Sequence, residues 1–239
     1  MRGGMDFEET NVVSVSLRRQ VEDKLRRAIV KGRFPPGVHL ADKTLCELFN
    51  VSRTVIREAV RQLEAEGLVK SVPHKGSFVK ILSLEEARHI YSVRGVLEAL
   101  AAREFVRNAS DSKIDELAKE LENLRSAASG PLDVVDQKEA FYEVLLSGSG
   151  NSYITMMLGQ ILNWTTQLRA TSLSAPNRLE ESIVELERLL EAIRNRDENA
   201  AWAASFQHVT NAAKVALAIM AEREGNESEP SEMKVRAGI

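Results

Sequence analysis

A single cysteine, Cys46, is present among the 239 residues, so the chain cannot form a disulfide with itself. This is typical of proteins in a reducing cytoplasm, and we interpret Cys46 as a small core residue rather than a redox sensor. Long apolar runs are also missing, because none approaches the roughly 20 residues that a membrane-spanning helix requires. The N-terminal sequence MRGGMDFEETN is polar and does not resemble a signal peptide. We therefore expect a cytoplasmic protein without a membrane partner.

Catalytic motifs are missing as well. The sequence has no nucleophile motif, no Gly-rich phosphate-binding loop and no signature of paired catalytic carboxylates. Ser205 and His208 lie close in sequence, but such spacing is common by chance. We therefore expect no enzyme activity and no cofactor. The length, with 44% hydrophobic residues, is enough for one large domain or two smaller ones.

Strand patterns are absent after residue 81, where helical spacing of apolar residues dominates. Before that point we expect a helix over 15–32, ending at Gly32 ahead of a rigid Pro35–Gly37 turn. A capping box at Ser83 and Glu86 begins a long helix. Later breaks predict helices at 111–128, 132–147, 152–172, 177–195 and 197–221, with a loose arm at 1–12 and a disordered tail at 222–239.

The segment 40–81 carries the most specific pattern in the sequence. A short amphipathic helix stops at Asn50, which tolerates the left-handed conformation that ends a helix. Ser52 can cap a second amphipathic helix, which ends at Gly67. Two short apolar runs follow, joined by the basic turn Pro73-His74-Lys75-Gly76. Helix, tight turn, helix and hairpin predict a winged helix-turn-helix, whose second helix enters the major groove of DNA.

Arginines lie four residues apart on that second helix, at Arg53, Arg57 and Arg61. Such a stripe is often only a solvated face. Here it starts directly after the turn, at the end of the helix that reaches base edges, and a basic wing follows. Charge is also uneven, because residues 1–80 hold 15 Lys+Arg against 10 Asp+Glu and residues 81–239 hold 17 against 25. The basic excess favours contact with the phosphates of double-stranded DNA.

The first part of the chain resembles the DNA-binding domain of the GntR family of bacterial transcription regulators. The resemblance rests on the I-x-x-G-x-F-x-P-G stretch at 29–37, the VSR-x-x-I-RE-A run at 51–59, the L-x-x-EGLV run at 63–69 and Gly76 in the wing. One departure is Val55, where the family often has proline.

That resemblance implies roles for individual residues. The positions of Arg53 and Arg57 contact bases in the family, and the planar arginine fork independently suits guanine O6 and N7. Ser52, Thr54 and Lys75 suit phosphate contacts, which position a protein without specifying a sequence. The first helix of the motif and the wing also contact DNA in the family. The expected DNA-binding residues are therefore Lys43, Ser52, Arg53, Thr54, Arg57, His74, Lys75 and Gly76.

The remainder of the chain resembles the all-helical FCD effector domain of the fatty-acid-regulator branch of that family. The matching features are R-x-x-L-E at Arg94–Glu98, Phe141 followed by Ser149-Gly150-Asn151, and E-A-I-x-x-x-D-x-x-x-A at 191–201 leading to His208. The resemblance implies a domain that binds a small effector and holds a homodimer together.

Many FCD domains hold a divalent metal with one aspartate and three histidines, and this chain departs from that pattern. The matching positions are Lys138, Tyr142, Leu186 and His208, so only the last ligand is kept. A single imidazole beside a lysine is not a transition-metal site, because the ammonium repels the ion and too few ligands remain. We therefore expect no bound metal.

Two interpretations of these positions stay open. They can be ordinary helix residues, with Tyr142 filling the space of the ion. Alternatively, they line an effector cavity in which Lys138 replaces the charge of the metal and attracts a carboxylate or phosphate. The effector-binding residues expected on this second interpretation are Arg94, Lys138, Tyr142, Trp164 and His208.

The sequence thus predicts a mainly α protein. We expect a winged helix-turn-helix of three helices and a two-stranded wing over 13–81, and an all-helical bundle for effector binding and dimerisation over 82–221. The expected function is a ligand-responsive transcription regulator, a repressor, that binds a near-palindromic operator as a homodimer and senses a small organic acid or other anionic metabolite. The alternatives are a DNA-binding protein whose helical domain serves only dimerisation, and an enzyme in the helical domain.

Overall fold

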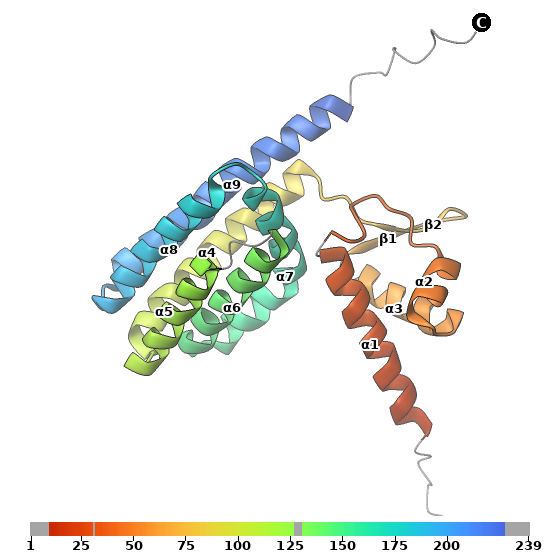
Figure 1. Ribbon diagram of the computed structural model, residues 1–239, viewed down its shortest axis with the longest axis horizontal. Coiled ribbons are helices and arrows are strands. Elements are labelled where there is room, and N and C mark those ends of the chain that lie inside the picture. The colour runs from red at the N-terminus through yellow and green to blue at the C-terminus, as the bar shows by residue number, and fades with distance from the viewer. Residues whose placement is uncertain (1–9, 31, 127–130, 228–239) are drawn as a thin grey trace, which may run out of the picture. The chain divides into compact units, whose positions relative to one another are not determined.

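The computed structural model describes residues 10–30, 32–126 and 131–227, and these fold mainly into α-helices (Figure 1). The chain divides into two compact units between Leu82 and Ser83. The predicted fold class is confirmed, since an N-terminal unit with a two-stranded wing precedes an all-helical unit. None of the described helices is both long and apolar enough to span a membrane.

The first unit contains helices α1 (Thr10–Val30), α2 (Asp42–Phe49) and α3 (Arg53–Ala65) and the strands β1 (Val69–Val72) and β2 (Gly76–Val79). The strands pair antiparallel, with Val69 opposite Val79 and Val72 opposite Gly76. Helix α1 begins at Thr10, so the arm expected over 1–12 is already helical from that residue, and residues 1–9 lie outside the described part.

Local signals place α3 as the sequence predicted. Asn50 adopts the left-handed conformation, with φ 53°, and ends α2. The Ser52 hydroxyl then accepts a hydrogen bond from the Val55 amide at 3.5 Å and caps α3. One face of α3 is buried against α1 and the wing, in a core that contains Val21, Leu25, Ile29, Leu45, Ile56, Ala59, Leu63, Leu68 and Val79. Burial of this face leaves the opposite side of α3 free for a ligand.

Gly76 is required at the tip of the wing. Its φ is +98°, and a Cβ built on it would lie 2.6 Å from Nε2 of His39. The His39 ring packs on Phe78, with centroids 4.9 Å apart, and the same two residues form a backbone bridge that supports β2. Only glycine allows this close approach, so the identity of Gly76 has a structural cause beside the predicted role in DNA contact.

Replacing Gly76 with alanine should therefore destabilise the wing by about 1–3 kcal/mol, because a side chain adds both backbone strain and a clash with His39. Gly32→Ala is the matched control, since Gly32 also has a positive φ (+74°) but has nothing within 4 Å of its Cβ position. Hydrogen exchange of the β1 and β2 amides measures the effect. Equal protection in the two variants would show that contact with His39 does not constrain the wing.

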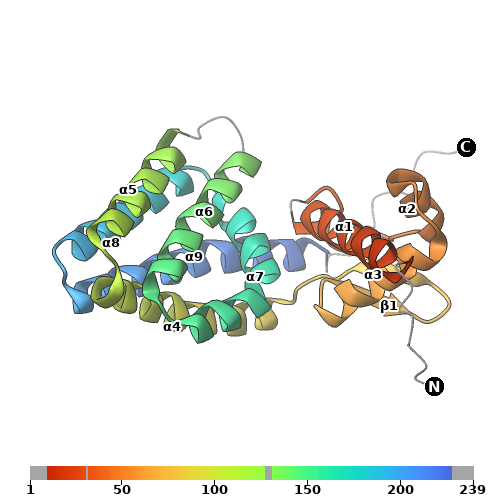
Figure 2. The same ribbon diagram turned by 90° about the horizontal axis from the view of Figure 1, so that it is seen from below.

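The second unit is a helical bundle of α4 (Leu84–Asn108), α5 (Asp111–Ser126), α6 (Pro131–Ser149), α7 (Ser152–Leu173), α8 (Arg178–Arg194) and α9 (Glu198–Glu227). Helix α4 packs along α9 and also contacts α6 and α7, as both views show (Figures 1 and 2). The predicted capping box begins α4, because Ser83 Oγ accepts from the Glu86 amide and the Glu86 carboxylate accepts from the Ser83 amide. Phe105, Leu117, Phe141, Leu145 and Leu186 are among the buried residues of its core.

The end of α9 differs from the sequence prediction. We expected the helix to stop at 221 and a disordered tail to follow, but α9 continues through Glu227. One reason is a tertiary contact, since the Glu224 carboxylate accepts a hydrogen bond from the Leu84 amide at 3.2 Å and ties the last turns of α9 to the start of α4. Residues 228–239 lie outside the described part of the chain.

Candidate DNA-binding surface and effector site

The exposed face of α3 begins with Arg53, the first residue of the helix, and continues with Thr54 and Arg57. Lys43 is exposed on α2, the preceding helix of the motif. The Ser52 hydroxyl serves as the helix cap, so its hydrogen-bonding capacity is partly used within the protein. These exposed positions are compatible with the predicted contacts to bases and phosphates.

Arg57 already has an anionic partner within the unit. Its Nε donates to Oδ2 of Asp42 on α2 at 2.9 Å, although the side chain is 61% exposed. An exposed pair of this kind is weak and easily exchanged for a phosphate or a base. Asp42 therefore pairs with Arg57 within the unit, a contact that the sequence alone did not indicate.

The tip of the wing presents two basic side chains. His74 has φ 61°, a left-handed conformation, and Lys75 closes the turn by donating its amide to the Val72 carbonyl at 3.0 Å. Both side chains are exposed. The turn therefore projects His74 and Lys75 away from the hairpin, as contact with a DNA groove requires.

The helical unit contains a buried polar cluster at the positions that the family uses for metal ligands. Lys138, 3% exposed, donates from Nζ to the Ser182 hydroxyl at 2.7 Å and lies 3.3 Å from Nε2 of His208. His208 Nδ1 lies 2.6 Å from Oε2 of Glu185. Because a carboxylate only accepts, Nδ1 carries the proton and Nε2 accepts from Lys138. The Lys138 side chain therefore faces the interior of the helical unit.

A second group of charges continues the cluster through α4 and α7. Arg94 donates from Nε to Oε1 of Glu98 at 2.7 Å, and Arg169 reaches the same oxygen at 3.2 Å. The Arg169 guanidinium lies over the Tyr142 ring, 4.0 Å from its centroid. Burial disfavours ionisation of Glu98, but Arg94 and then Arg169 outweigh it and lower the pKa of this carboxyl group to about 2. Glu98 is thus the shared anion of two buried arginines.

Positive charge exceeds negative charge in this cluster. The buried cationic side chains are Arg94, Arg169 and Arg178, and the carboxylates that form buried ion pairs with them are those of Glu98 and Glu185. Burial, followed by the three arginines, lowers the pKa of Lys138 well below its ordinary value of 10.5. Within the described residues, Nη1 of Arg94, Nε of Arg169, and Nε and Nη1 of Arg178 have no hydrogen-bond partner. Buried unpaired donors are costly, so the cluster is suited to an anion.

A pocket of about 280 Å³ reaches this cluster. Its polar inner end includes Glu98, Tyr142 and Arg169, and the remaining lining residues are Glu139, Glu143, Leu146, Ser147, Thr155, Leu158, Gly159 and Thr165. These residues lie on α4, α6 and α7. Arg169 lines this pocket, and within the described residues its Nε has no hydrogen-bond partner.

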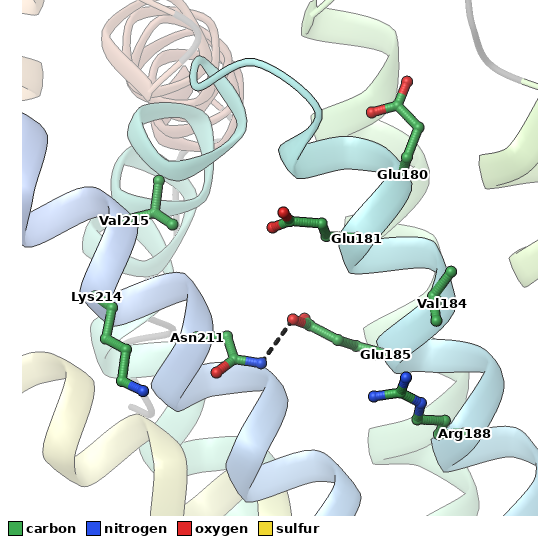
Figure 3. A pocket seen from close by; sticks show the side chains of 8 residues that line it. All are labelled: Glu180, Glu181, Val184, Glu185, Arg188, Asn211, Lys214 and Val215. Carbon is green, nitrogen blue, oxygen red and sulfur yellow. Dashed lines mark hydrogen bonds between the residues drawn. The ribbon is translucent and has the colours of Figure 1, made fainter.

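A wider groove of about 570 Å³ lies between α8 and α9 (Figure 3). Glu185 and Asn211 face each other across it, joined by a hydrogen bond of 2.8 Å from the Asn211 amide. Glu185 also binds Arg178 and His208, so its carboxylate separates the groove from the buried cluster. Glu180 and Glu181 add negative charge to the same wall. Arg188 and Lys214 also line the groove, so it carries charges of both signs.

The predicted effector residues are only partly brought together. Lys138 contacts His208. Arg94 and Arg169 bind the same carboxylate, that of Glu98, and the Arg169 guanidinium lies over the Tyr142 ring. Trp164 is buried on α7 but does not line the pocket at Arg169. Sequence reasoning missed the other members of the cluster, which are Glu98, Arg169, Arg178, Ser182 and Glu185. For Glu98 the available signal was the R-x-x-L-E motif, which places Glu98 one turn after Arg94.

The side chains present do not fit a metal centre. The lysine amine of Lys138 sits against Nε2 of His208, Tyr142 lies under Arg169, and Leu186 is in the hydrophobic core. Among the residues described, no group of three or more His, Cys, Asp and Glu side chains is placed to bind an ion. The remaining donors are therefore too few and too cationic for the family's metal site.

The ionisation of this cluster predicts sensitivity to acid. Burial, and then Lys138, lowers the pKa of His208 from 6.5 to about 3. Between these two pH values, the imidazole is protonated in the unfolded chain but neutral in the folded unit. This contribution to stability should be lost progressively as the pH falls below 6.5. Melting curves between neutral and acidic pH test it. His208→Gln should flatten the upper part of that decline, and an unchanged profile would place His208 in a solvated environment.

Known proteins share both units. A family model described as bacterial regulatory proteins, gntR family, matches residues 17–79, and the FCD domain model matches residues 89–211. The uncharacterized HTH-type transcriptional regulator YdhC of Bacillus subtilis (strain 168) is 28% identical over 185 residues, covering 76% of this chain and 83% of that protein. The HTH-type transcriptional repressor GlaR of Escherichia coli (strain K12) is 30% identical over 196 residues, covering 77% and 89%.

A solved structure shows the same fold. McbR/YncC of E. coli superposes with a TM-score of 0.72 at 23% identity, covering 87% of this chain and 98% of the other. Together with the winged unit and the helical bundle, these matches confirm the resemblance found in the sequence and exclude the enzyme alternative. The chain therefore belongs to the GntR family, in the branch with an FCD domain, and is a ligand-responsive DNA-binding transcription regulator.

Proposed function

We propose that the helical unit senses a small anion, which binds at the buried arginines reached from the pocket between α6 and α7. The observation that carries this proposal is the excess of buried cationic groups, with guanidinium N–H donors that have no partner in the described protein. An anion supplies the missing acceptors through charge-assisted hydrogen bonds, each worth about 1.5–3 kcal/mol. In this chain fixed side-chain charges take the place of the family's metal ion.

Binding changes affinity for DNA only if the anion prefers one of two conformations of the protein. The cluster supports such a preference, since it joins α4, α6, α7, α8 and α9 through buried ion pairs and hydrogen bonds. An added negative charge redistributes these contacts among several helices at once. The effector signal therefore starts as a change in how the helices of this unit are held together.

Lys138→Met tests the role assigned to the lysine. An anion bound at Arg169 and Arg94 raises the pKa of Lys138 again, so the wild type should take up a proton on binding and bind more weakly as the pH rises. Lys138→Met should lose this pH dependence and at least about tenfold in affinity, while keeping its affinity for DNA without ligand. Calorimetry in buffers of different ionisation enthalpy measures both quantities. An unchanged affinity and proton uptake in Lys138→Met would remove the lysine from the site.

We propose further that the protein is a repressor that binds a near-palindromic operator as a homodimer in the cytoplasm, where its DNA lies. GlaR, a relative, is named a transcriptional repressor, which supports the direction of regulation. A two-fold dimer presents two α3 helices, which suits two half-sites. On each half-site, the base contacts are assigned to Arg53 and Arg57, and the backbone contacts to Lys43, Ser52, Thr54 and the wing residues His74, Lys75 and Gly76.

A further inference from the structure

The pocket between α6 and α7 presents charges of both signs at its polar end. One stripe of α6 lines it at helical spacing, with the residues Glu139, Tyr142, Glu143, Leu146 and Ser147. The facing stripe of α7 contributes Thr155, Leu158, Gly159, Thr165 and Arg169. Glutamates thus lie on the α6 side and an arginine on the α7 side of one small pocket.

Two polar side chains at the inner end are almost fully buried, and each has one atom without a hydrogen-bond partner among the described residues. Arg169 is 4% exposed and Thr165 is 2% exposed. Nε of Arg169 and Oγ1 of Thr165 have no hydrogen-bond partner in the described part of the chain, and both residues line the pocket. A guanidinium N–H beside a hydroxyl is a suitable recognition pair for a carboxylate.

The α6 side of this pocket carries negative charge from two glutamates, Glu139 and Glu143. Burial lowers the pKa of Arg169 and Arg94 adds to that shift, whereas Glu98 and Glu139 oppose it, so the field of Glu139 reaches the guanidinium. Glu143 lies one helical turn further along the same stripe of α6. A carboxylate bound to Arg169 would meet this negative potential unless the ligand carried a positive group on the side facing α6.

The other lining residues determine the size and polarity of a ligand that fits this pocket. Leu146 and Leu158 provide apolar surface, while Ser147 and Thr155 provide hydroxyls. A Cβ built on Gly159 has nothing within 4 Å, so the glycine leaves space beside Leu158. The volume of about 280 Å³ suits a small metabolite rather than a cofactor.

We infer that the effector of this regulator is an α-amino acid or a close analogue, with its carboxylate on Arg169 and Thr165, its ammonium toward Glu143, and its side chain between Leu146 and Leu158. The inference rests on the proposed anion-sensing function and narrows its ligand class. An α-amino acid carries a carboxylate and an ammonium group on the same carbon, which matches a pocket whose two helices carry opposite charges. The ammonium therefore offsets the repulsion between the ligand carboxylate and the glutamates of α6.

Matched ligands test the inference on the full-length protein. Melting temperatures are measured with alanine, valine, leucine and threonine, and with the corresponding acids that lack the amino group, propionate, isovalerate, isocaproate and β-hydroxybutyrate. At least one amino acid should stabilise the protein and bind about tenfold or more tightly than its deaminated partner. Equal stabilisation by the acids would overturn the inference and leave the anion-sensing proposal standing. Failure of every amino acid to bind would also overturn it.

A pair of charge-matched variants locates the ammonium. Glu143→Gln should weaken binding of the stabilising amino acid by about tenfold and bring it close to the deaminated acid. Glu191→Gln is the control, because Glu191 is exposed on α8, away from the residues that line the pocket. Equal affinities in the two variants would contradict the role of Glu143 and with it the assignment of the ligand class.

Discussion

Arg53→Ala is expected to lose about 1–3 kcal/mol of binding free energy on the operator, which raises the dissociation constant roughly fivefold to 150-fold. Arg53 is the first residue of α3, is exposed, and follows the Ser52 cap directly, so its side chain starts at the end of the helix that enters the groove. On a scrambled duplex the loss should be much smaller, because only the contact to a base edge is specific. Fluorescence anisotropy on both duplexes, at one salt concentration, measures the difference.

Arg61→Ala is the internal control for this result. Arg61 lies on the same helix, is also exposed, and is two turns further from the N-terminal end. Arg61→Ala should weaken binding to both duplexes equally, because a residue two turns along the helix is expected to contact a phosphate or no part of the DNA. If Arg53→Ala also reduced the affinity for both duplexes equally, Arg53 would contact the DNA backbone, and other residues would have to read the bases.

Glu98→Gln should be among the most destabilising conservative substitutions in the helical unit. It leaves Arg94 and Arg169 charged and buried without their shared anion, at a cost of about 3–5 kcal/mol. For a protein of this size the loss corresponds to a fall in melting temperature of roughly 10 °C. Glu98 is 1% exposed, so water does not replace the missing charge. Thermal unfolding followed by circular dichroism measures this change.

The exposed pair of Lys113 and Glu116 provides the comparison. Its N–O distance is 2.6 Å, close to the 2.7 Å between Arg94 and Glu98, but Glu116 is 47% exposed. Glu116→Gln should therefore change stability by less than about 1 kcal/mol. Similar melting temperatures for Glu98→Gln and Glu116→Gln would mean that the buried arginines do not depend on Glu98 for compensation, and the charge balance of the cluster would need another explanation.

The winged unit could be predicted almost residue by residue because its signals are local. The left-handed Asn50, the Ser52 cap and the two-stranded wing act over a few positions in sequence and appear where the pattern places them. The predicted end of α9 was wrong because its position depends on a contact between residues far apart in the sequence. Its last turns are tied down by the contact between Glu224 and Leu84, residues 140 positions apart, which no local pattern reveals.

The effector cluster was only half predictable. Homologous positions identified Lys138 and His208, and these two do meet. The pairing of Arg169 with Glu98 spans 71 positions and joins two different helices, so nothing in either local sequence indicates it. A charged residue on an otherwise buried stripe was the available signal, because ionised side chains are rarely buried without partners. By this criterion, Arg169 and Arg178 could have been predicted from the sequence as members of the buried charge cluster.

We propose that this regulator senses its effector directly through side-chain charges, without a metal ion. The most direct test is operator affinity in the presence of EDTA, with and without the amino acid or acid that most raises the melting temperature, on a duplex selected by the protein from random DNA. We expect the ligand to change the dissociation constant for the operator by at least about fivefold although EDTA is present. A ligand response that disappears in EDTA and returns with a divalent metal would contradict it.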